Sequence, residues 1–184
     1  MKKITYIIMA FVISLLGVLW VSLTPIFFPS VHAEEVTAAP HAGFMAPPFE
    51  LQTSDNRNLS LTNYEGKPRL VFFWASWCSV CKATMPGLQK VYETFQEDGF
   101  KILAINSTSQ DNLQNALQYY QAQGYTFPML LDQDGEAAYA YQIRALPTAV
   151  LINSDGTISE VIIGSGVSQG YLTAALSSLF EGKE

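Results

Sequence analysis

The chain has 184 residues, with 10 lysines and arginines against 16 aspartates and glutamates, so its formal net charge is −6 at pH 7. This acidic balance argues against nucleic acid or an anionic membrane surface as a partner, because both repel negative charge. The sequence holds only two cysteines and two histidines, which is a poor supply of ligands for a zinc site. We therefore expect neither a metal nor another cofactor.

The first 33 residues differ from the rest of the chain. Lys2 and Lys3 precede an uncharged, mostly apolar run, and the next charged residue is Glu34. Such a run is long enough to span a bilayer, which takes about 20 apolar residues. Lysines ahead of the run and acidic residues behind it fit an N-terminus inside the cell and a remainder outside.

Two interpretations of residues 1–33 stay open. A cleaved signal peptide is compatible with 31-VHA-33, which has small residues at the two positions that matter for cleavage. A retained membrane anchor is favoured, because the apolar run exceeds the roughly 7–15 residues of the apolar h-region of an ordinary signal peptide. In either case the remainder is extracytoplasmic, held at the cell membrane by the anchor or else secreted or periplasmic, and disulfides persist there.

Residues 34–48 are rich in alanine and proline and are predicted to be a tether. Residues 49–184 follow as a single domain of about 136 residues, enough for one hydrophobic core. Without Lys2 and Lys3 the exported part has 8 basic and 16 acidic residues, a net charge of −8. We expect this domain to be a monomer.

The first predicted elements of the domain are a strand at 69–74 and a helix from Ser79 to about Gln96. The strand is an almost continuous apolar run, which is typical of a strand buried on both faces. The helix has apolar residues at helical spacing and contains Pro86, which we expect to kink it.

The remaining elements follow in chain order. We predict a strand at 101–106, a helix at 112–123, a short apolar strand at 127–131, a short helix at 136–141, strands at 148–153 and 157–163, and a helix at 169–180. Ser154-Asp155-Gly156 joins the last two strands and is a hairpin turn signal. This order predicts an α/β fold, a mixed central sheet covered by helices on both faces.

The two cysteines, Cys78 and Cys81, lie where the first strand gives way to the first helix. As a structural staple they would close a very small loop and add little stability. A zinc site would need more ligands, and the only histidines, His32 and His41, both precede the predicted domain. A redox couple is favoured, since the helix N-terminus stabilises a Cys78 thiolate and Cys81 can then resolve a mixed disulfide.

Several short motifs together resemble the TlpA/ResA-like branch of the thioredoxin superfamily, from about Ala46 to Leu179. They are 46-APPF-49, 64-YEGKP-68, 73-FWASWC-78, 85-MP-86 and 146-LPT-148. The resemblance implies a thioredoxin fold with an extra N-terminal hairpin and an insertion around Ser109–Gln123. It also implies thiol–disulfide exchange at the membrane, commonly the reduction of exported proteins such as apocytochrome c.

The resemblance also assigns roles to single residues. Cys78 resembles the exposed nucleophile, and Cys81 resembles the buried resolving cysteine. Pro147 resembles the superfamily's cis-proline, and a cis bond there would turn the Leu146 backbone towards the sulfurs for pairing with a substrate strand. Trp77 would flank Cys78 and contact the substrate. The implied partners are exported protein thiols and disulfides, and a membrane electron-transfer protein that recycles the reductase.

Three positions depart from the family pattern. Val80 stands where family members usually have proline before the second cysteine, which leaves the direction of electron flow open. Phe72 replaces a buried aspartate of thioredoxins, and Thr84 replaces a glutamate that is common among cytochrome-maturation members. The sequence therefore names no catalytic base, and water is left to carry the proton.

Three rival functions follow from the same residues. A net disulfide-forming oxidase would differ from a reductase in its reduction potential. A peroxidase of the peroxiredoxin type would need a Thr-x-x-Cys motif, but position 75 is alanine. A binding module with an idle cysteine pair would keep its function when both cysteines are lost.

Overall fold

A seven-stranded sheet organises the fold, with the strand order β2-β1-β5-β4-β3-β6-β7. The structure is a computed structural model that describes residues 4, 12, 14, 15 and 40–181. Its strands are β1 (Glu50–Thr53), β2 (Asn58–Ser60), β3 (Arg69–Trp74), β4 (Lys101–Asn106), β5 (Met129–Leu131), β6 (Thr148–Ile152) and β7 (Ile158–Ile163). Because β4 pairs in parallel with both β3 and β5 while β6 is antiparallel to β3, the sheet is mixed, as predicted.

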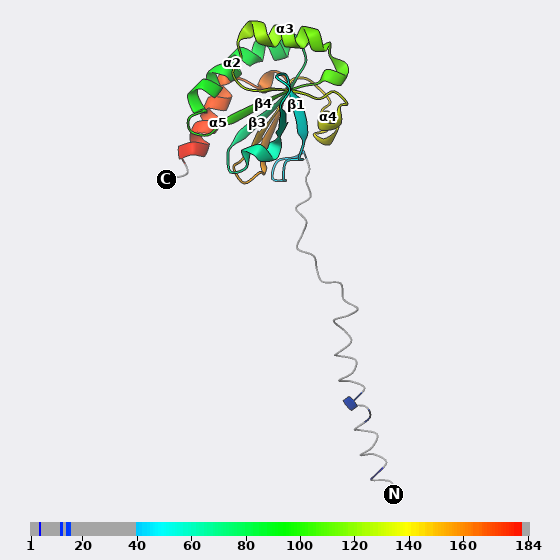
Figure 1. The fold of residues 1–184 in the computed structure, drawn as a ribbon. Coiled ribbons are helices and arrows are strands. Elements are labelled where there is room, and N and C mark those ends of the chain that lie inside the picture. Colours follow the sequence, from blue (N-terminus) through cyan, green and yellow to red (C-terminus); the bar gives the residue numbers. More distant parts are fainter. Residues whose placement is uncertain (1–3, 5–11, 13, 16–39, 182–184) are drawn as a thin grey trace. The chain divides into compact units, whose positions relative to one another are not determined.

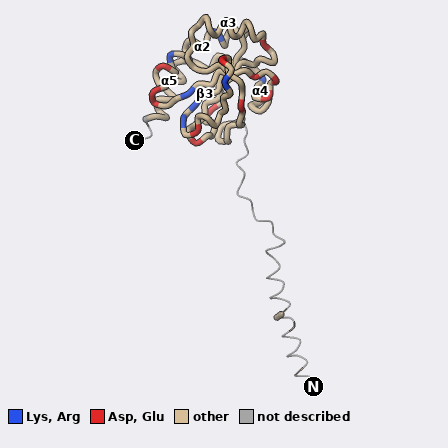
Figure 2. The backbone as a smooth tube through the Cα atoms, in the orientation of Figure 1, with Lys and Arg blue, Asp and Glu red and all other residues tan. Residues whose placement is uncertain are grey.

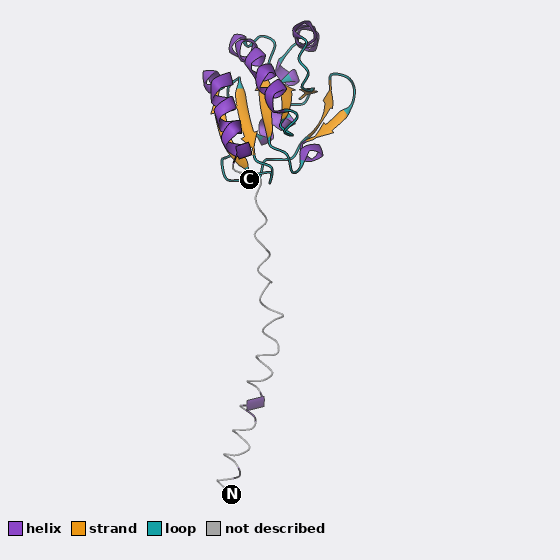
Figure 3. Cartoon of the chain, turned by 90° about the vertical axis from the view of Figure 1, so that its left-hand side faces the viewer, coloured by secondary structure: helices purple, strands orange, loops and turns teal. Residues whose placement is uncertain are grey.

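Helices cover both faces of this sheet (Figure 1). The helices of the described chain from α2 on are α2 (Ser79–Phe95), α3 (Leu113–Gln123), α4 (Glu136–Ala140) and α5 (Gln169–Glu181), with 3₁₀ turns η1 (Leu61–Tyr64), η2 (Thr108–Gln110) and η3 (Gly164–Gly166). Residues of α2, α3 and α5 share one apolar core cluster, whereas α4 and η1 contribute to the other. Figure 3 shows helices lying in front of the strands, as expected for the face that carries α2 and α5.

Strand β3 joins the two core clusters. All six of its residues are buried. Phe72 and Trp74 belong to the cluster beneath α2, α3 and α5, whereas Val71 and Phe73 belong to the cluster on the α4 side. This alternation follows from the period of two in a strand and confirms the predicted burial on both faces.

The residues of β1 and β2 pair antiparallel, and β1 also pairs antiparallel with β5. These strands are short, and their burial is less complete than that of β3. The β1–β2 pair lies where the resemblance implied an extra N-terminal hairpin. That this pair and the segment Ser109–Gln123 are additions to the family's common fold stays a prediction.

The predicted anchor or signal peptide, 1–33, lies outside the described residues except for positions 4, 12, 14 and 15. Within the part of the chain that the structure describes, no helix has the length and apolar character needed to cross a membrane. The identity of this segment therefore stays a prediction.

The folded region begins before Phe49, the boundary that the sequence predicted. The N–H of Gly43 donates to the carbonyl of Ile158 at 2.8 Å, and the N–H of Ile158 donates to the carbonyl of Phe44 at 2.8 Å. Met45 forms an antiparallel bridge with Thr157. The second half of the predicted tether thus adds a short extended segment to the β6–β7 hairpin, a contact that composition alone does not reveal.

The carboxylate of Asp132 anchors the start of α4. Asp132 follows β5, is fully buried, and accepts the N–H groups of Ala137 at 3.1 Å and Ala138 at 2.9 Å. Burial raises the pKa of Asp132, although these hydrogen bonds from Ala138 and Ala137 act in the opposite direction. The helix start is therefore held by a carboxylate whose ionised form is disfavoured by desolvation.

This raised pKa predicts a pH-dependent contribution to stability. The ionised carboxylate costs stability at neutral pH, and that cost is relieved as the pH falls through the raised pKa of Asp132. We expect the free energy of unfolding of the wild type, relative to Asp132→Asn, to rise between about pH 7 and pH 4. Urea denaturation at a series of pH values measures this difference, and a difference that does not change with pH contradicts the assignment.

Candidate active site

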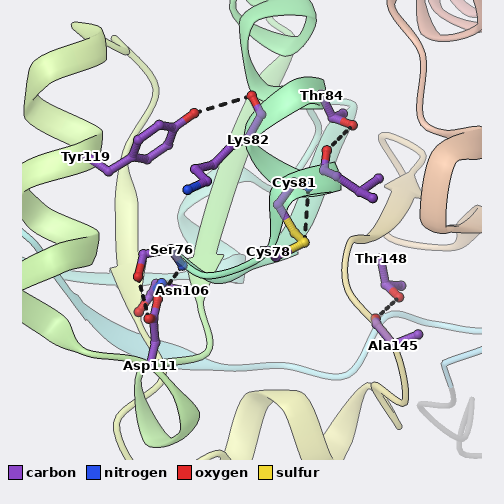
Figure 4. The surroundings of a disulfide bond; sticks show 11 residues. Ser76, Cys78, Cys81, Lys82, Thr84, Asn106, Asp111, Tyr119, Ala145 and Thr148 are labelled. Carbon is purple, nitrogen blue, oxygen red and sulfur yellow. Dashed lines mark hydrogen bonds between the residues drawn. A yellow bond between two sulfur atoms is a disulfide. The ribbon is translucent and has the colours of Figure 1, made fainter.

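Cys78 and Cys81 form a disulfide at the start of α2, with 5.2 Å between their Cα atoms. Cys78 is the N-cap residue of the helix, and the N–H of Cys81 donates to its sulfur at 3.1 Å (Figure 4). The predicted position at a strand-to-helix junction is confirmed. When the disulfide is reduced, the free N–H groups and dipole of the helix favour negative charge on Cys78.

The two cysteines differ little in exposure. In this oxidised form 6% of Cys78 is exposed and none of Cys81. Cys78 is the more accessible of the two, but it is a buried residue, whereas the resemblance implied an exposed one. It is buried because it packs in the same apolar cluster as Phe72 and Trp74.

Trp77 follows the end of β3, and the Leu146–Pro147 peptide precedes the start of β6. Because these two strands pair antiparallel, both segments lie at the same edge of the sheet. Trp77 is 60% exposed, and its indole N–H donates to the carbonyl of Gln110 at 3.1 Å. The Leu146–Pro147 bond is cis, as the resemblance implied. The residues on either side of this peptide, Ala145 and Thr148, belong to the surroundings of the disulfide (Figure 4).

The carboxylate of Asp111 holds the loop that leads from β3 to Cys78, a role that sequence reasoning missed. It accepts the backbone N–H and the hydroxyl of Ser76, both at 2.6 Å, the side-chain amide of Asn106 at 2.8 Å, and the N–H of Asn112 at 2.8 Å. An ionised carboxylate has only hydrogen-bond acceptors, about four in number, so these four donors match its capacity. The one signal that could have revealed this contact is the parallel pairing of β3 and β4, because it puts the loops that follow the two strands at the same edge of the sheet.

Tyr119 of α3 supports the first turns of α2 from the other side. Pro86 has no N–H, so the carbonyl of Lys82, four residues earlier, lacks its usual helical partner. The hydroxyl of Tyr119 donates to this carbonyl at 3.3 Å (Figure 4). The segment predicted as an insertion, Ser109–Gln123, therefore contacts the chain both before Cys78 and after Cys81.

The comparisons with known proteins agree with this geometry. The AhpC/TSA family matches residues 42–161 of the chain. The thiol-disulfide oxidoreductase ResA of Geobacillus thermodenitrificans is 33% identical over 165 residues, which cover 90% of this chain and 91% of that protein. The chain belongs to the AhpC/TSA family of the thioredoxin superfamily. It is a thiol–disulfide oxidoreductase of the ResA-like kind.

Two further comparisons support this assignment of the oxidoreductase. The sporulation thiol-disulfide oxidoreductase A of Bacillus subtilis is 33% identical over 140 residues, covering 75% of this chain and 81% of that protein. The crystal structure of StoA from Bacillus subtilis matches with a TM-score of 0.61 at 31% identity, covering 70% of this chain and 95% of that one. The predicted thioredoxin fold and enzyme class are thereby confirmed.

The departures from the family pattern give this oxidoreductase an apolar site. Phe72 is fully buried in the cluster that contains both cysteines. The hydroxyl of Thr84 donates to the carbonyl of Val80 at 3.0 Å, within α2. Neither position supplies a carboxylate to Cys81, and among the described residues no cluster of His, Cys, Asp and Glu is suited to hold a metal ion.

The four hydrogen bonds of Asp111 predict a measurable loss when they are removed. We expect Asp111→Ala to lower the free energy of unfolding by about 2 kcal/mol, because partly buried donors of Ser76 and Asn106 lose their acceptor. Ser76→Ala removes only the hydroxyl bond and should cost about 1 kcal/mol. Urea denaturation compares the two, and equal losses would mean that Asp111 does not anchor the loop beyond that single bond.

Proposed function

We propose that this oxidoreductase reduces disulfides of exported proteins through the Cys78/Cys81 couple. The observation that carries the proposal is the placement of the pair: Cys78 caps α2 and is the only one of the two cysteines with any exposed surface. A disulfide whose accessible sulfur lies at a helix N-terminus is suited to exchange, since that sulfur is the better leaving group and the better attacking thiolate.

The reaction proceeds in two exchanges. The Cys78 thiolate attacks one sulfur of the client disulfide, which breaks the client's S–S bond, forms a mixed disulfide and releases the client's other sulfur as a thiolate. Cys81 then loses its proton and attacks the Cys78 sulfur, which forms the Cys78–Cys81 disulfide and releases the second client thiolate. The client gains two electrons and, from water, two protons.

The resolving step needs a proton acceptor for Cys81. Phe72 and Thr84 provide no carboxylate there, and Cys81 itself has no exposed surface in the oxidised form. We assign the acceptor role to water that reaches the site when the mixed disulfide has opened the cysteine pair.

Three residues complete the proposed substrate site. Trp77 presents a large exposed ring beside Cys78. Leu146 offers its backbone to an extended client segment, in the manner of strand addition to a sheet edge. Pro147, which has no N–H and whose carbonyl accepts the N–H of Gly164 at 2.8 Å, contributes the cis bond that orients Leu146. Strand pairing gives affinity for many sequences, which suits an enzyme with several clients.

The setting of the reaction is part of the proposal. Residues 1–33 act as a membrane anchor that keeps the domain at the outer surface of the cell membrane. A membrane electron-transfer protein returns two electrons to the Cys78–Cys81 disulfide after each cycle. The resemblance to ResA-like proteins favours clients of cytochrome c maturation, whose Cys-x-x-Cys-His motif must be reduced before haem attachment.

Trapping with single cysteine variants tests the proposal. We expect Cys81→Ser to accumulate a mixed disulfide through Cys78 with an oxidised peptide that contains Cys-x-x-Cys-His, because the resolving thiol is missing. Cys78→Ser should form none under the same conditions, and the wild type should release reduced peptide. Non-reducing electrophoresis and mass spectrometry identify the adduct.

The reverse pattern, in which Cys78→Ser traps the peptide and Cys81→Ser does not, contradicts the assigned roles. Retention of the biological phenotype after loss of both cysteines would favour the binding module instead.

A further inference from the structure

A polar groove lies along the edge of the sheet where β4 and β5 end. Its walls come from η2, α4 and the segment that leads to Leu146, and they enclose about 780 Å³. Gln110 on one wall accepts the indole N–H of Trp77, and Arg144 on another wall precedes Leu146 by two residues. Two of its lining residues are thus linked to residues of the candidate active site, Gln110 by a hydrogen bond and Arg144 along the chain, and the groove lies at the edge where ligands of parallel sheets commonly bind.

The wall formed by α4 and the residues after it is held by backbone hydrogen bonds. The N–H of Gln142 donates to the carbonyl of Tyr139 at 2.9 Å, and the N–H of Ile143 donates to the carbonyl of Ala138 at 2.8 Å. With Gln142 at a φ of 49°, this is the left-handed helix end in which glycine is usual. The wall is thus already formed before any client binds, and Arg144 follows it directly.

Among the described residues, Arg144 is the only cation that lines the groove. Its side chain is exposed, and within the described part of the chain the one ion pair is between Arg57 and Asp55, so Arg144 is in none. Asp134 is the only carboxylate that the described part of the chain places on the groove walls, and it accepts the N–H of Glu136 at the start of α4. The groove lining, as far as the structure describes it, therefore carries one cation, two residues before Leu146, and one anion.

The surface of the protein as a whole is acidic. The chain has a net charge of −6, and acidic positions lie around α4, which forms one wall of the groove (Figure 2). Acidic client segments are repelled by most of this surface, so a single accessible cation two residues before Leu146 has a large effect on where they bind. Tyr139, which is 85% exposed on the same groove, adds an aromatic contact for the client.

We propose that this groove binds an extended segment of the client next to its target disulfide, and that Arg144 selects segments with an acidic residue there. The inference rests on the proposed function, since it names the client class of the same site. Arg144 is a specificity-determining residue in this scheme and takes no part in the transfer of electrons.

The test compares two disulfide-bonded peptides that differ only in whether Glu or Lys flanks the cysteine. The full-length chain, reduced and kept in detergent, is assayed for kcat/KM with each peptide and with hydroxyethyl disulfide, a small neutral substrate. Arg144→Glu is compared with Lys90→Glu, which makes the same change in charge at an exposed position of α2 outside the groove. Arg144→Lys keeps the positive charge.

We expect the wild type to favour the Glu peptide by about fivefold, as for an exposed charge pair, with a smaller preference at high salt. Arg144→Glu should reverse the preference, whereas Lys90→Glu and Arg144→Lys should keep it. All four proteins should reduce hydroxyethyl disulfide equally.

Equal rates for the two peptides in the wild type, a preference for Lys, or identical shifts in Arg144→Glu and Lys90→Glu would overturn the inference. In those cases intact reduction of hydroxyethyl disulfide leaves the proposed function standing. Failure of the wild type to reduce hydroxyethyl disulfide would overturn the proposed function, and this inference with it.

Discussion

The position of Cys78 depends on strand β3, which is held by paired strands on both sides and by packed side chains on both faces. The strand pairs in parallel with β4 on one side and antiparallel with β6 on the other, and all of its side chains are buried in one of the two core clusters. The carboxyl end of β3 therefore cannot shift without disturbing both core clusters. The loop after β4 and the loop before β6 meet the same edge, which brings Asp111 and the Leu146–Pro147 peptide to the neighbourhood of the disulfide.

At this end of β3, apolar side chains surround the cysteines, and polar side chains hydrogen-bond to the backbone on either side of them. Cys81 packs among buried apolar residues, where Phe72 takes the place of a charged group. Asp111 holds the loop before Cys78, and Tyr119 supplies the hydrogen bond that Pro86 takes away from α2. The helix start that carries both sulfurs is thus stabilised from outside α2, by residues of the segment between β4 and β5.

Local patterns in the sequence predicted the parts of the fold that depend on local physics. The apolar run of β3, the helical spacing of α2 and the cysteine pair at their junction each needed only a few neighbouring residues. Asp111 and Tyr119 were missed, because a polar residue in a loop or on a helix shows no periodicity that reveals a distant partner. The burial of Cys78 and the pairing of Gly43 with Ile158 likewise depend on contacts between segments far apart in the chain. The cis bond before Pro147 was anticipated only through the resemblance to the family.

The central claim is that the Cys78/Cys81 couple works as a reductant, and its equilibrium potential tests this most directly. The full-length chain is equilibrated with glutathione and with dithiothreitol at defined ratios, and the disulfide fraction is read by thiol labelling. The account predicts a potential near that of thioredoxin, about −270 mV. A potential near that of a dedicated oxidant, about −120 mV, would contradict it and make the enzyme a source of disulfides.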